Sequence, residues 1–189
     1  MHKMRLGRTG IQASRSGFGA LPIQRVSPGE AERLLRLAYD NGFNFFDTAR
    51  AYSDSEAKLG SALVGVRRHI YIATKTQARD KAGLLRDLEI SLKHLKTDYV
   101  DILQLHNATV LPDASDPDSL YGGLCEARKR GMTRFIGVTS HRREVALEAV
   151  QSGIYDTVQS PLSSLSSVDD LAVVEACRSK DIGLIAMKA

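Results

Sequence analysis

The chain has 189 residues, of which 43% are hydrophobic, and this length is sufficient for one well-buried core. Its net charge of +4 is mild, and its basic residues have no interleaved aromatic stripe, which argues against a nucleic-acid-binding groove. No apolar stretch approaches the roughly 20 residues that cross a bilayer, and residues 1–5 lead into no signal-peptide core, so we expect a cytoplasmic protein that does not engage a membrane.

The first residues of the chain predict a small β-hairpin, with residues 4–6 and 11–13 on either side of the turn Gly7-Arg8-Thr9-Gly10. Beyond it, strand-like and helix-like patterns alternate to the end of the chain. Strands are expected at residues 16–21, 43–48, 70–75, 100–106, 135–140, 157–160 and 183–188. Most of these segments are near-continuous apolar runs, as burial on both faces of a parallel sheet requires.

The segments between the strands carry helix start and stop signals. Ser27, Pro28 and Glu30 predict an N-cap, a first-turn proline and a capping box, and residues 53–56 repeat the capping-box pattern. Asp116-Pro117 is expected to open a later helix that Gly131 closes. Apolar residues recur three or four positions apart in these segments, as in helices that pack on a sheet. Cys125 and Cys177 fall inside predicted helices and are expected to be reduced packing residues.

The alternation of strands and helices permits a doubly wound sheet or a barrel, because parallel strands need helical crossovers. The dinucleotide fingerprint G-x-G-x-x-G is absent, since Gly17-Phe18-Gly19 is followed by Ala20-Leu21-Pro22. We therefore predict one α/β domain over residues 1–189, a (β/α)8 TIM barrel with an N-terminal β-hairpin. The chain ends at strand seven, so we expect the barrel to be incomplete here and an eighth strand to come from further chain or another molecule. Open sheet edges would favour self-association.

Polar side chains end several of the predicted strands. Asp47, Lys75 and His106 follow the second, third and fourth apolar runs, and Tyr52 comes five positions after Asp47. Active sites of (β/α)8 barrels lie at this rim. A buried Asp47 needs a partner, for which Lys75 on the next strand is expected. A lysine ammonium near the phenol would lower the pKa of Tyr52 and make it a usable general acid, while His106 could orient a carbonyl group.

Each of these residues taken alone also has a structural explanation. Asp47 and Lys75 could form an ion pair at the barrel mouth, and His106 could be a satisfied core imidazole, so the functional interpretation depends on the whole set. No zinc-ligand spacing and no G-x-S-x-G nucleophile elbow occur, and we predict no metal site. A set without metal or strong nucleophile favours hydride transfer from an external cofactor.

Five segments resemble the aldo-keto reductase family: residues 6–10, 46–52, 73–76, 101–106 and 135–138. The resemblance implies a barrel that binds NADPH and reduces an aldehyde or ketone to an alcohol. The family's catalytic tetrad falls on Asp47, Tyr52, Lys75 and His106, with Tyr52 as general acid, Lys75 tuning Tyr52, and Asp47 holding Lys75. The resemblance implies cofactor contacts at Gly19, Ala20, Asp47, Thr139, Ser140, Gln159 and Met187.

The chain departs from the family pattern at three places. Thr139-Ser140 stands where the family usually has Ser-Asn, and Met187 replaces the tyrosine that stacks on nicotinamide. The segment that grips the adenosine phosphate lies beyond strand seven, so the preference for NADPH over NADH stays open. The chain is similar to a bacterial branch whose fuller members can add a C-terminal iron–sulfur module, and two cysteines cannot hold such a cluster.

Two other functions stay open. The first is a non-catalytic NADP(H)-binding regulatory subunit on the same fold. The second is Schiff-base chemistry by Lys75, which ranks last because pairing with Asp47 keeps the lysine protonated and weakly nucleophilic. The small carbonyl substrate is not identified by the sequence, and residues 107–119 are the one long loop expected to set specificity.

Overall fold

A computed structural model of the chain describes residues 1–188. Seven parallel strands form one sheet in which each strand pairs with its neighbours in chain order. They are β3 (Phe18–Gly19), β4 (Phe45–Asp47), β5 (Tyr71–Thr76), β6 (Val100–Leu105), β7 (Thr133–Thr139), β8 (Thr157–Pro161) and β9 (Gly183–Met187). Within residues 1–188 no strand pairing joins β9 to β3, so the barrel is open between them, which confirms the prediction of an incomplete (β/α)8 barrel.

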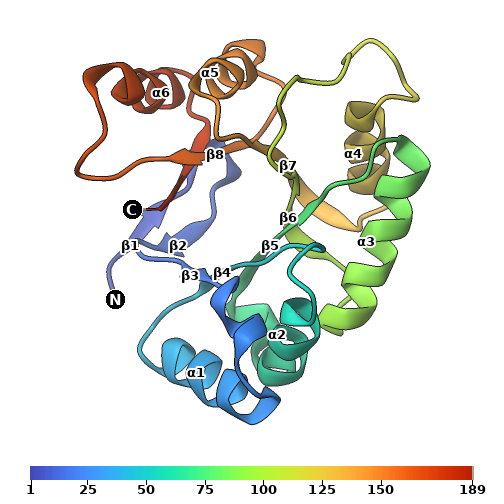
Figure 1. Cartoon of the computed structure of the whole chain (residues 1–189), viewed down its shortest axis with the longest axis vertical. Helices are drawn as coiled ribbons and strands as arrows, with labels where there is room; N and C mark the ends of the chain where they lie inside the picture. The colour runs from blue at the N-terminus through green and yellow to red at the C-terminus, as the bar shows by residue number, and fades with distance from the viewer. Residues whose placement is uncertain (189) are drawn as a thin grey trace.

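Helices cover the outer face of this sheet. They are α1 (Pro28–Asp40), α2 (Ser55–Leu63), α3 (Lys81–Leu95), α4 (Leu120–Lys129), α5 (Arg143–Ser152) and α6 (Val168–Ser179), with 3-10 turns η2 (Pro22–Arg25) and η3 (Val64–His69). Figure 1 shows the helices in an arc around the strands, with a gap between α6 and α1 on the side where both chain ends lie. The gap coincides with the unpaired edges of β3 and β9.

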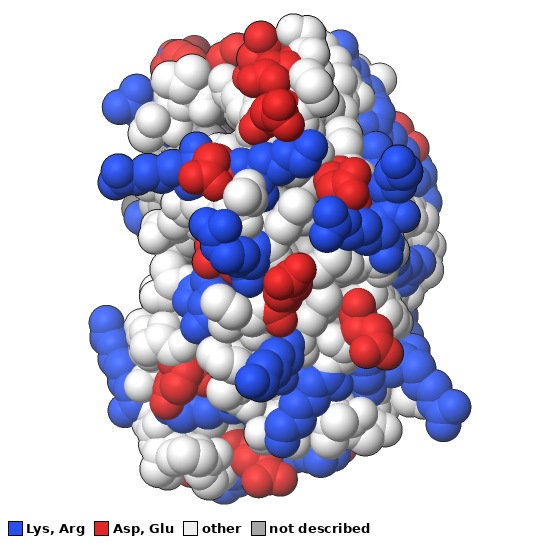
Figure 2. Space-filling view, turned by 90° about the vertical axis from the view of Figure 1, so that its right-hand side faces the viewer, with Lys and Arg blue, Asp and Glu red and all other residues white. Residues whose placement is uncertain are grey.

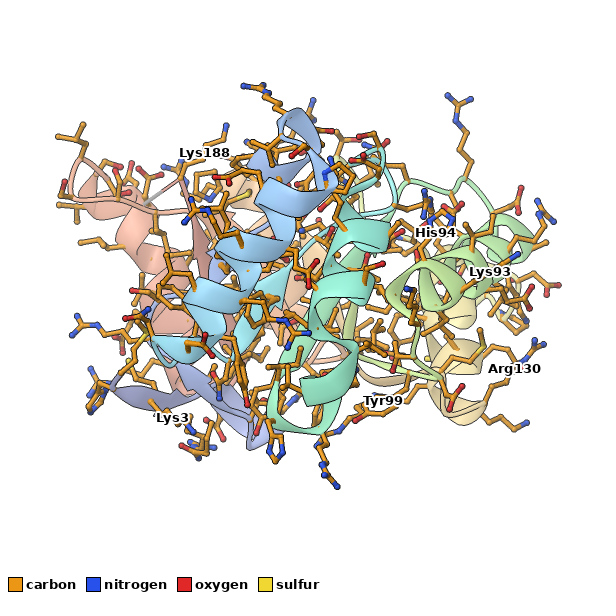
Figure 3. The ribbon with its side chains drawn as sticks, turned by 90° about the horizontal axis from the view of Figure 1, so that it is seen from below. Lys3, Lys93, His94, Tyr99, Arg130 and Lys188 are labelled. Carbon is orange, nitrogen blue, oxygen red and sulfur yellow. The ribbon has the colours of Figure 1, made fainter. Side chains whose placement is uncertain are left out.

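The N-terminal hairpin packs into one end of the barrel. Strands β1 (Lys3–Arg5) and β2 (Gln12–Ser14) pair antiparallel around the 3-10 turn η1 (Gly7–Thr9), as predicted. Ile11 and Ala13 pack with Phe45 inside the barrel. A Cβ on Gly7 would lie 2.3 Å from the backbone nitrogen of Gly183, so only glycine permits this approach to β9. Figure 3 shows Lys188 near the top of the view and Lys3 near the bottom, both on the left-hand side, which places the hairpin away from the C-terminal end of β9.

The near-continuous apolar strands divide their side chains between two cores. Phe46, Ile72 and Leu103 pack in the larger cluster between the sheet and the helices. Phe45, Ala73 and Ile102 belong to a smaller cluster inside the barrel. Because side chains alternate between the two faces of a strand, residues two positions further along β4, β5 and β6 also point inside. This rule places Asp47, Lys75 and Gln104 in the lumen, at the ends of their strands.

Three local predictions are corrected by the structure. The strand expected at residues 16–21 is shortened to β3, because Pro22 starts η2. Helix α4 begins at Leu120 with Ser119 as its N-cap, three positions after the proline that was expected to open it. At α1 the Ser27 hydroxyl accepts from the Glu30 N–H as expected, but the Glu30 carboxylate pairs with Arg33, so the capping box is only half formed.

The second predicted capping box, over residues 53–56, is wrong. Ser53 has a positive φ of 40°, and its hydroxyl donates to the Gln24 side chain. Asp54 occupies the N-cap of α2 without a side-chain cap bond. Glu56, which would have closed the box, is completely buried and accepts a hydrogen bond from the Thr74 hydroxyl instead. The buried contacts of the Glu56 carboxylate therefore prevail over the capping box that the local sequence predicts.

Candidate active site

The predicted ion pair between Asp47 and Lys75 forms inside the barrel mouth. The Lys75 ammonium donates to Asp47 Oδ2 at 2.6 Å and to the carbonyl oxygen of Thr48 at 2.7 Å. Gln159 Nε2 lies 3.3 Å from the same carboxylate oxygen. The Lys75 side chain is only 3% exposed, and a charge this buried needs such partners to offset its desolvation. The pair is thus held in a fixed position at the ends of β4 and β5.

Tyr52 and His106 meet above this ion pair. The Lys75 Nζ lies 5.3 Å from the centre of the Tyr52 ring, and the rings of Tyr52 and His106 contact edge to face with centroids 5.6 Å apart. Tyr52 comes from the loop between β4 and α2, and His106 directly follows β6. The structure therefore brings together all four residues that the sequence proposed as a set.

The pKa of Tyr52 departs from the expected direction. Burial of the phenol and the nearby Asp47 carboxylate raise the pKa of Tyr52 above its ordinary value, whereas the sequence led us to expect Lys75 to lower it. The reason is geometric, because the Lys75 ammonium donates to Asp47 and Thr48, and within residues 1–188 it makes no hydrogen bond to the phenol. Tyr52 consequently stays protonated at neutral pH and keeps a proton to donate.

His106 is held in its neutral form. Burial, followed by the Lys75 charge, lowers the pKa of His106 to about 4. Its Nδ1 atom is buried and has no hydrogen-bond partner within the described part of the chain. A neutral imidazole offers one N–H donor and one acceptor nitrogen. His106 can therefore present a donor to a neutral oxygen atom near Tyr52 without carrying charge.

Comparison with known proteins identifies the family of this site. The model of the aldo/keto reductase family matches residues 15–189. The chain belongs to the aldo/keto reductase family. L-galactose dehydrogenase of Arabidopsis thaliana is 31% identical over 199 residues, which cover 95% of this chain and 62% of that protein. Methylglyoxal reductase of Salmonella typhi is 36% identical over 137 residues, covering 68% of this chain and 51% of that protein. The chain thus spans less than two thirds of the length of these relatives.

Solved aldo-keto reductases share the fold of this chain. The holo form of an enzyme from Bacillus halodurans is 26% identical with a TM-score of 0.85, over 98% of this chain and 65% of that one. A Klebsiella pneumoniae aldo/keto reductase in complex with NADP and acetate has a TM-score of 0.84 at 23% identity, over 98% and 67% of the two chains. These likenesses confirm the barrel prediction over nearly the whole chain.

Thr139 and Ser140, two of the positions at which cofactor contacts are expected from the sequence, form hydrogen bonds within the chain. The Thr139 hydroxyl accepts from the backbone N–H of Asn107 at 2.7 Å. The Ser140 hydroxyl donates to the carbonyl of Ala108 at 2.7 Å and accepts from the backbone N–H of Arg142 at 3.1 Å. Both side chains therefore shape the turn that follows His106, and the Ser140 hydroxyl has no proton left to donate.

The other expected cofactor positions lie at the same rim. Gly19 is exposed at the end of β3, in register with Asp47. Ala20 is buried, and its backbone N–H donates to the carbonyl of Asp47 at 2.8 Å. Met187 is half-buried at the end of β9, in register with Pro161. Their contact with a cofactor stays a prediction.

Gln104 is a lumen residue that sequence reasoning missed. Its Nε2 donates to Gln159 Oε1 at 3.2 Å, which links it through Gln159 to Asp47. Gln104 lies in the predicted strand 100–106, and a single amide between apolar residues does not by itself indicate a functional site. Its pairing register with Lys75 would have placed it on the lumen face.

Charged side chains also gather on the outer side of β5. Glu56 pairs with Arg50, and Arg50 Nη1 also lies 3.0 Å from His94 Nδ1 on α3, labelled in Figure 3. The sequence assigned His94 no role and Glu56 only a capping role.

Within residues 1–188 no helix is long and apolar enough to span a membrane. In the same range no cluster of three or more His, Cys, Asp or Glu side chains is placed to hold a metal ion.

Proposed function

We propose that this chain carries the catalytic site of an NADPH-dependent reductase that converts an aldehyde or ketone into an alcohol. The observation that carries the proposal is the meeting of Tyr52, Lys75, His106 and Asp47 at one barrel mouth. A protonated phenol, a fixed ammonium and a neutral imidazole suit one task, namely to stabilise and protonate an oxygen that gains negative charge.

Each residue has a separate role in this reaction. NADPH, when bound, supplies the hydride that the carbonyl carbon accepts. Tyr52 gives its phenolic proton to the carbonyl oxygen, and the Lys75 ammonium 5.3 Å from the ring centre stabilises the phenolate that is left. Asp47 keeps Lys75 in place. His106, neutral because its pKa is about 4, donates a hydrogen bond that orients the carbonyl.

The lumen has polar atoms that suit the carboxamide of a nicotinamide ring. Asp47 Oδ1 and Gln104 Oε1 are buried without hydrogen-bond partners in the described residues, and both accept N–H donors. A carboxamide brings two N–H donors and one acceptor oxygen. Asp47, Gln104 and Gln159 are therefore the side chains that we expect to hold this group. NADPH is named as the cofactor in this proposal because Klebsiella pneumoniae aldo/keto reductases that share the fold of this chain were solved with NADP and with NADPH.

A second candidate function is binding of NADP(H) without turnover, as a regulatory subunit. One relative favours it: an Arabidopsis thaliana protein named "Probable voltage-gated potassium channel subunit beta" is 33% identical over 133 residues, covering 62% of this chain and 39% of that protein. We place it second because all four tetrad residues are present and in contact here.

The two candidates are separated by one pair of measurements on the same sample. NADPH binding is followed by quenching or enhancement of its fluorescence, and turnover by loss of NADPH absorbance with methylglyoxal, a small and reactive carbonyl compound. Binding with steady NADPH consumption supports the reductase. Binding without consumption supports the regulatory subunit, and absence of both contradicts the two candidates together.

A further inference from the structure

A cleft of about 470 Å³ lies beside the barrel mouth, between two loops and helix α3. The loop after β4 contributes Arg50 and Ala51, and the loop after β5 contributes residues 77–79. The charged side chains of its lining are Arg50, Arg79, Arg86 and Asp87. The tetrad uses none of these four residues.

The cleft lies between the loop that carries Tyr52 and the loop that follows the strand of Lys75. Ala51 directly precedes Tyr52, and Gln77 follows Lys75 by two positions. The backbone N–H of Arg50 donates to the carbonyl of Lys75 at 2.9 Å, which ties the two loops together at this point. A molecule whose reacting end lies at Tyr52 can therefore extend its other end toward the cleft.

Two of the three cleft arginines form no direct ion pair in the described residues, although the Asp87 carboxylate lines the same cleft. Arg50 pairs with the buried Glu56, and the Asp87 carboxylate accepts from the Thr76 hydroxyl. Arg79 and Arg86 have no carboxylate within 4.0 Å in the part of the chain that the structure describes. Figure 2 shows acidic and basic side chains interspersed on the face of the molecule that it displays.

The position of the Arg86 guanidinium fits an anion in the cleft. Its Nη2 lies 3.7 Å from the point where a Cβ on Gly83 would sit, so it lies over the first turn of α3. The Asp80 carboxylate caps that turn by accepting from the Gly83 N–H at 2.6 Å, so the helix end is already occupied and the guanidinium groups carry the argument. A guanidinium binds carboxylate and phosphate groups through two parallel N–H donors. The cleft thus presents two guanidinium groups that have no carboxylate partner within 4.0 Å in the described residues.

We infer that this cleft is a specificity subsite that takes the anionic end of the carbonyl substrate, a carboxylate or a phosphate. The inference rests on the proposed reductase function and narrows it to a substrate class. Arg79 and Arg86 are its specificity-determining residues, and they act on substrate choice, not on the proton transfer at Tyr52.

The test compares two aldehydes of equal chain length, succinic semialdehyde with a carboxylate and butanal without one. For the unaltered chain we expect kcat/KM for succinic semialdehyde to exceed that for butanal by about tenfold or more at low salt. In the double variant R79A/R86A the ratio falls toward one, through a raised KM for succinic semialdehyde, while kcat/KM for butanal and the KM for NADPH stay unchanged. Arg68→Ala is the matched control, since this exposed arginine lies in η3, which precedes β5 at the opposite end of that strand.

Succinate and inorganic phosphate, titrated separately and observed by NMR at the Gly83 and Ala51 amides, give a readout that does not need turnover. Equal kcat/KM values for the two aldehydes would contradict the subsite, as would a preference for succinic semialdehyde that is unchanged in R79A/R86A. Neither result would contradict the proposed reductase function. No reduction of either aldehyde, with succinate still shifting these amides in the unaltered chain but not in R79A/R86A, overturns the reductase and keeps the anion site. A raised KM for NADPH in the double variant would assign the cleft to the cofactor phosphate and overturn the inference, as would the absence of both reduction and anion binding.

Discussion

Arg50, in the loop that carries Tyr52, forms an ion pair with Glu56 in the first turn of α2. Glu56 is completely buried, and its second carboxylate oxygen accepts from the Thr74 hydroxyl at 2.7 Å. Arg50 reaches in the same network to His94 on α3. Because Thr74 directly precedes Lys75, the network joins the Tyr52 loop to the strand that carries the ammonium.

We predict that Glu56→Gln lowers the free energy of unfolding by about 2–3 kcal/mol, because the Arg50 charge then loses its carboxylate partner in a mostly buried place. Urea denaturation followed by circular dichroism measures the loss. Glu30→Gln is the matched control, since Glu30 pairs with Arg33 on the exposed face of α1 and its removal leaves the midpoint unchanged. Equal midpoints for the two variants would show that the Arg50–Glu56 pair has no structural importance.

The Asp47–Lys75 pair gives a second stability prediction. Lys75→Met leaves the Asp47 carboxylate buried without its cation, and we expect a loss of about 3–5 kcal/mol in unfolding free energy. The double variant D47N/K75M removes both charges and recovers part of that loss. Denaturant unfolding of the three proteins measures the coupling, and a double variant less stable than Lys75→Met contradicts a direct pair.

The pKa of His106 gives a prediction about pH. Between pH 6.5 and about 4 the unfolded chain protonates this imidazole while the folded chain keeps it neutral. The contribution of His106 to stability is therefore fully present above pH 6.5 and is lost as pH falls toward 4. An NMR titration of the imidazole checks the midpoint, which we expect near 4 and expect to rise in Lys75→Met, because the neighbouring positive charge is gone. A midpoint near 6.5 in the unaltered chain would exclude the buried position of the ring.

Self-association through the open barrel edge is a further prediction. Helix α6 flanks β9 beside the gap in Figure 1, and its Leu171 side chain is 49% exposed. Exposed apolar side chains next to an unpaired strand edge favour pairing between molecules. We expect the sedimentation coefficient to rise with protein concentration, and Leu171→Glu to weaken that rise. Val110→Glu, in the loop between β6 and α4, should leave it unchanged, and a concentration-independent coefficient would refute the edge as a contact surface.

Most of the fold and the tetrad could be predicted from the sequence, because both depend on strand-end positions. Asp47 and Lys75 each interrupt an apolar run at its end, and the alternation of side chains along a strand places both in the lumen. Tyr52 was found by its spacing from Asp47. The same alternation also places Gln104 in the lumen. A single amide within an apolar run does not by itself indicate a functional residue, so Gln104 could be recognised only from its register with Lys75.

The remaining features depend on contacts that a sequence does not specify. The pKa of Tyr52 is raised first by burial of the phenol and then by the Asp47 carboxylate. The Lys75 ammonium donates to Asp47 and to the Thr48 carbonyl, and not to the phenol. Glu56 matched a capping box in the sequence, yet in the structure it forms an ion pair with the half-buried Arg50. Local sequence patterns do not predict these features, because the buried charged groups that pair with one another are not identified by their spacing in the chain.

The most direct test of the proposed function is reduction of methylglyoxal by Tyr52→Phe. This change removes only the phenolic oxygen and keeps the ring that contacts His106. We expect kcat to fall by about a hundredfold or more, with NADPH binding kept within about twofold, because Tyr52 supplies the proton and does not hold the cofactor. A variant that reduces methylglyoxal as fast as the unaltered chain would contradict Tyr52 as the general acid.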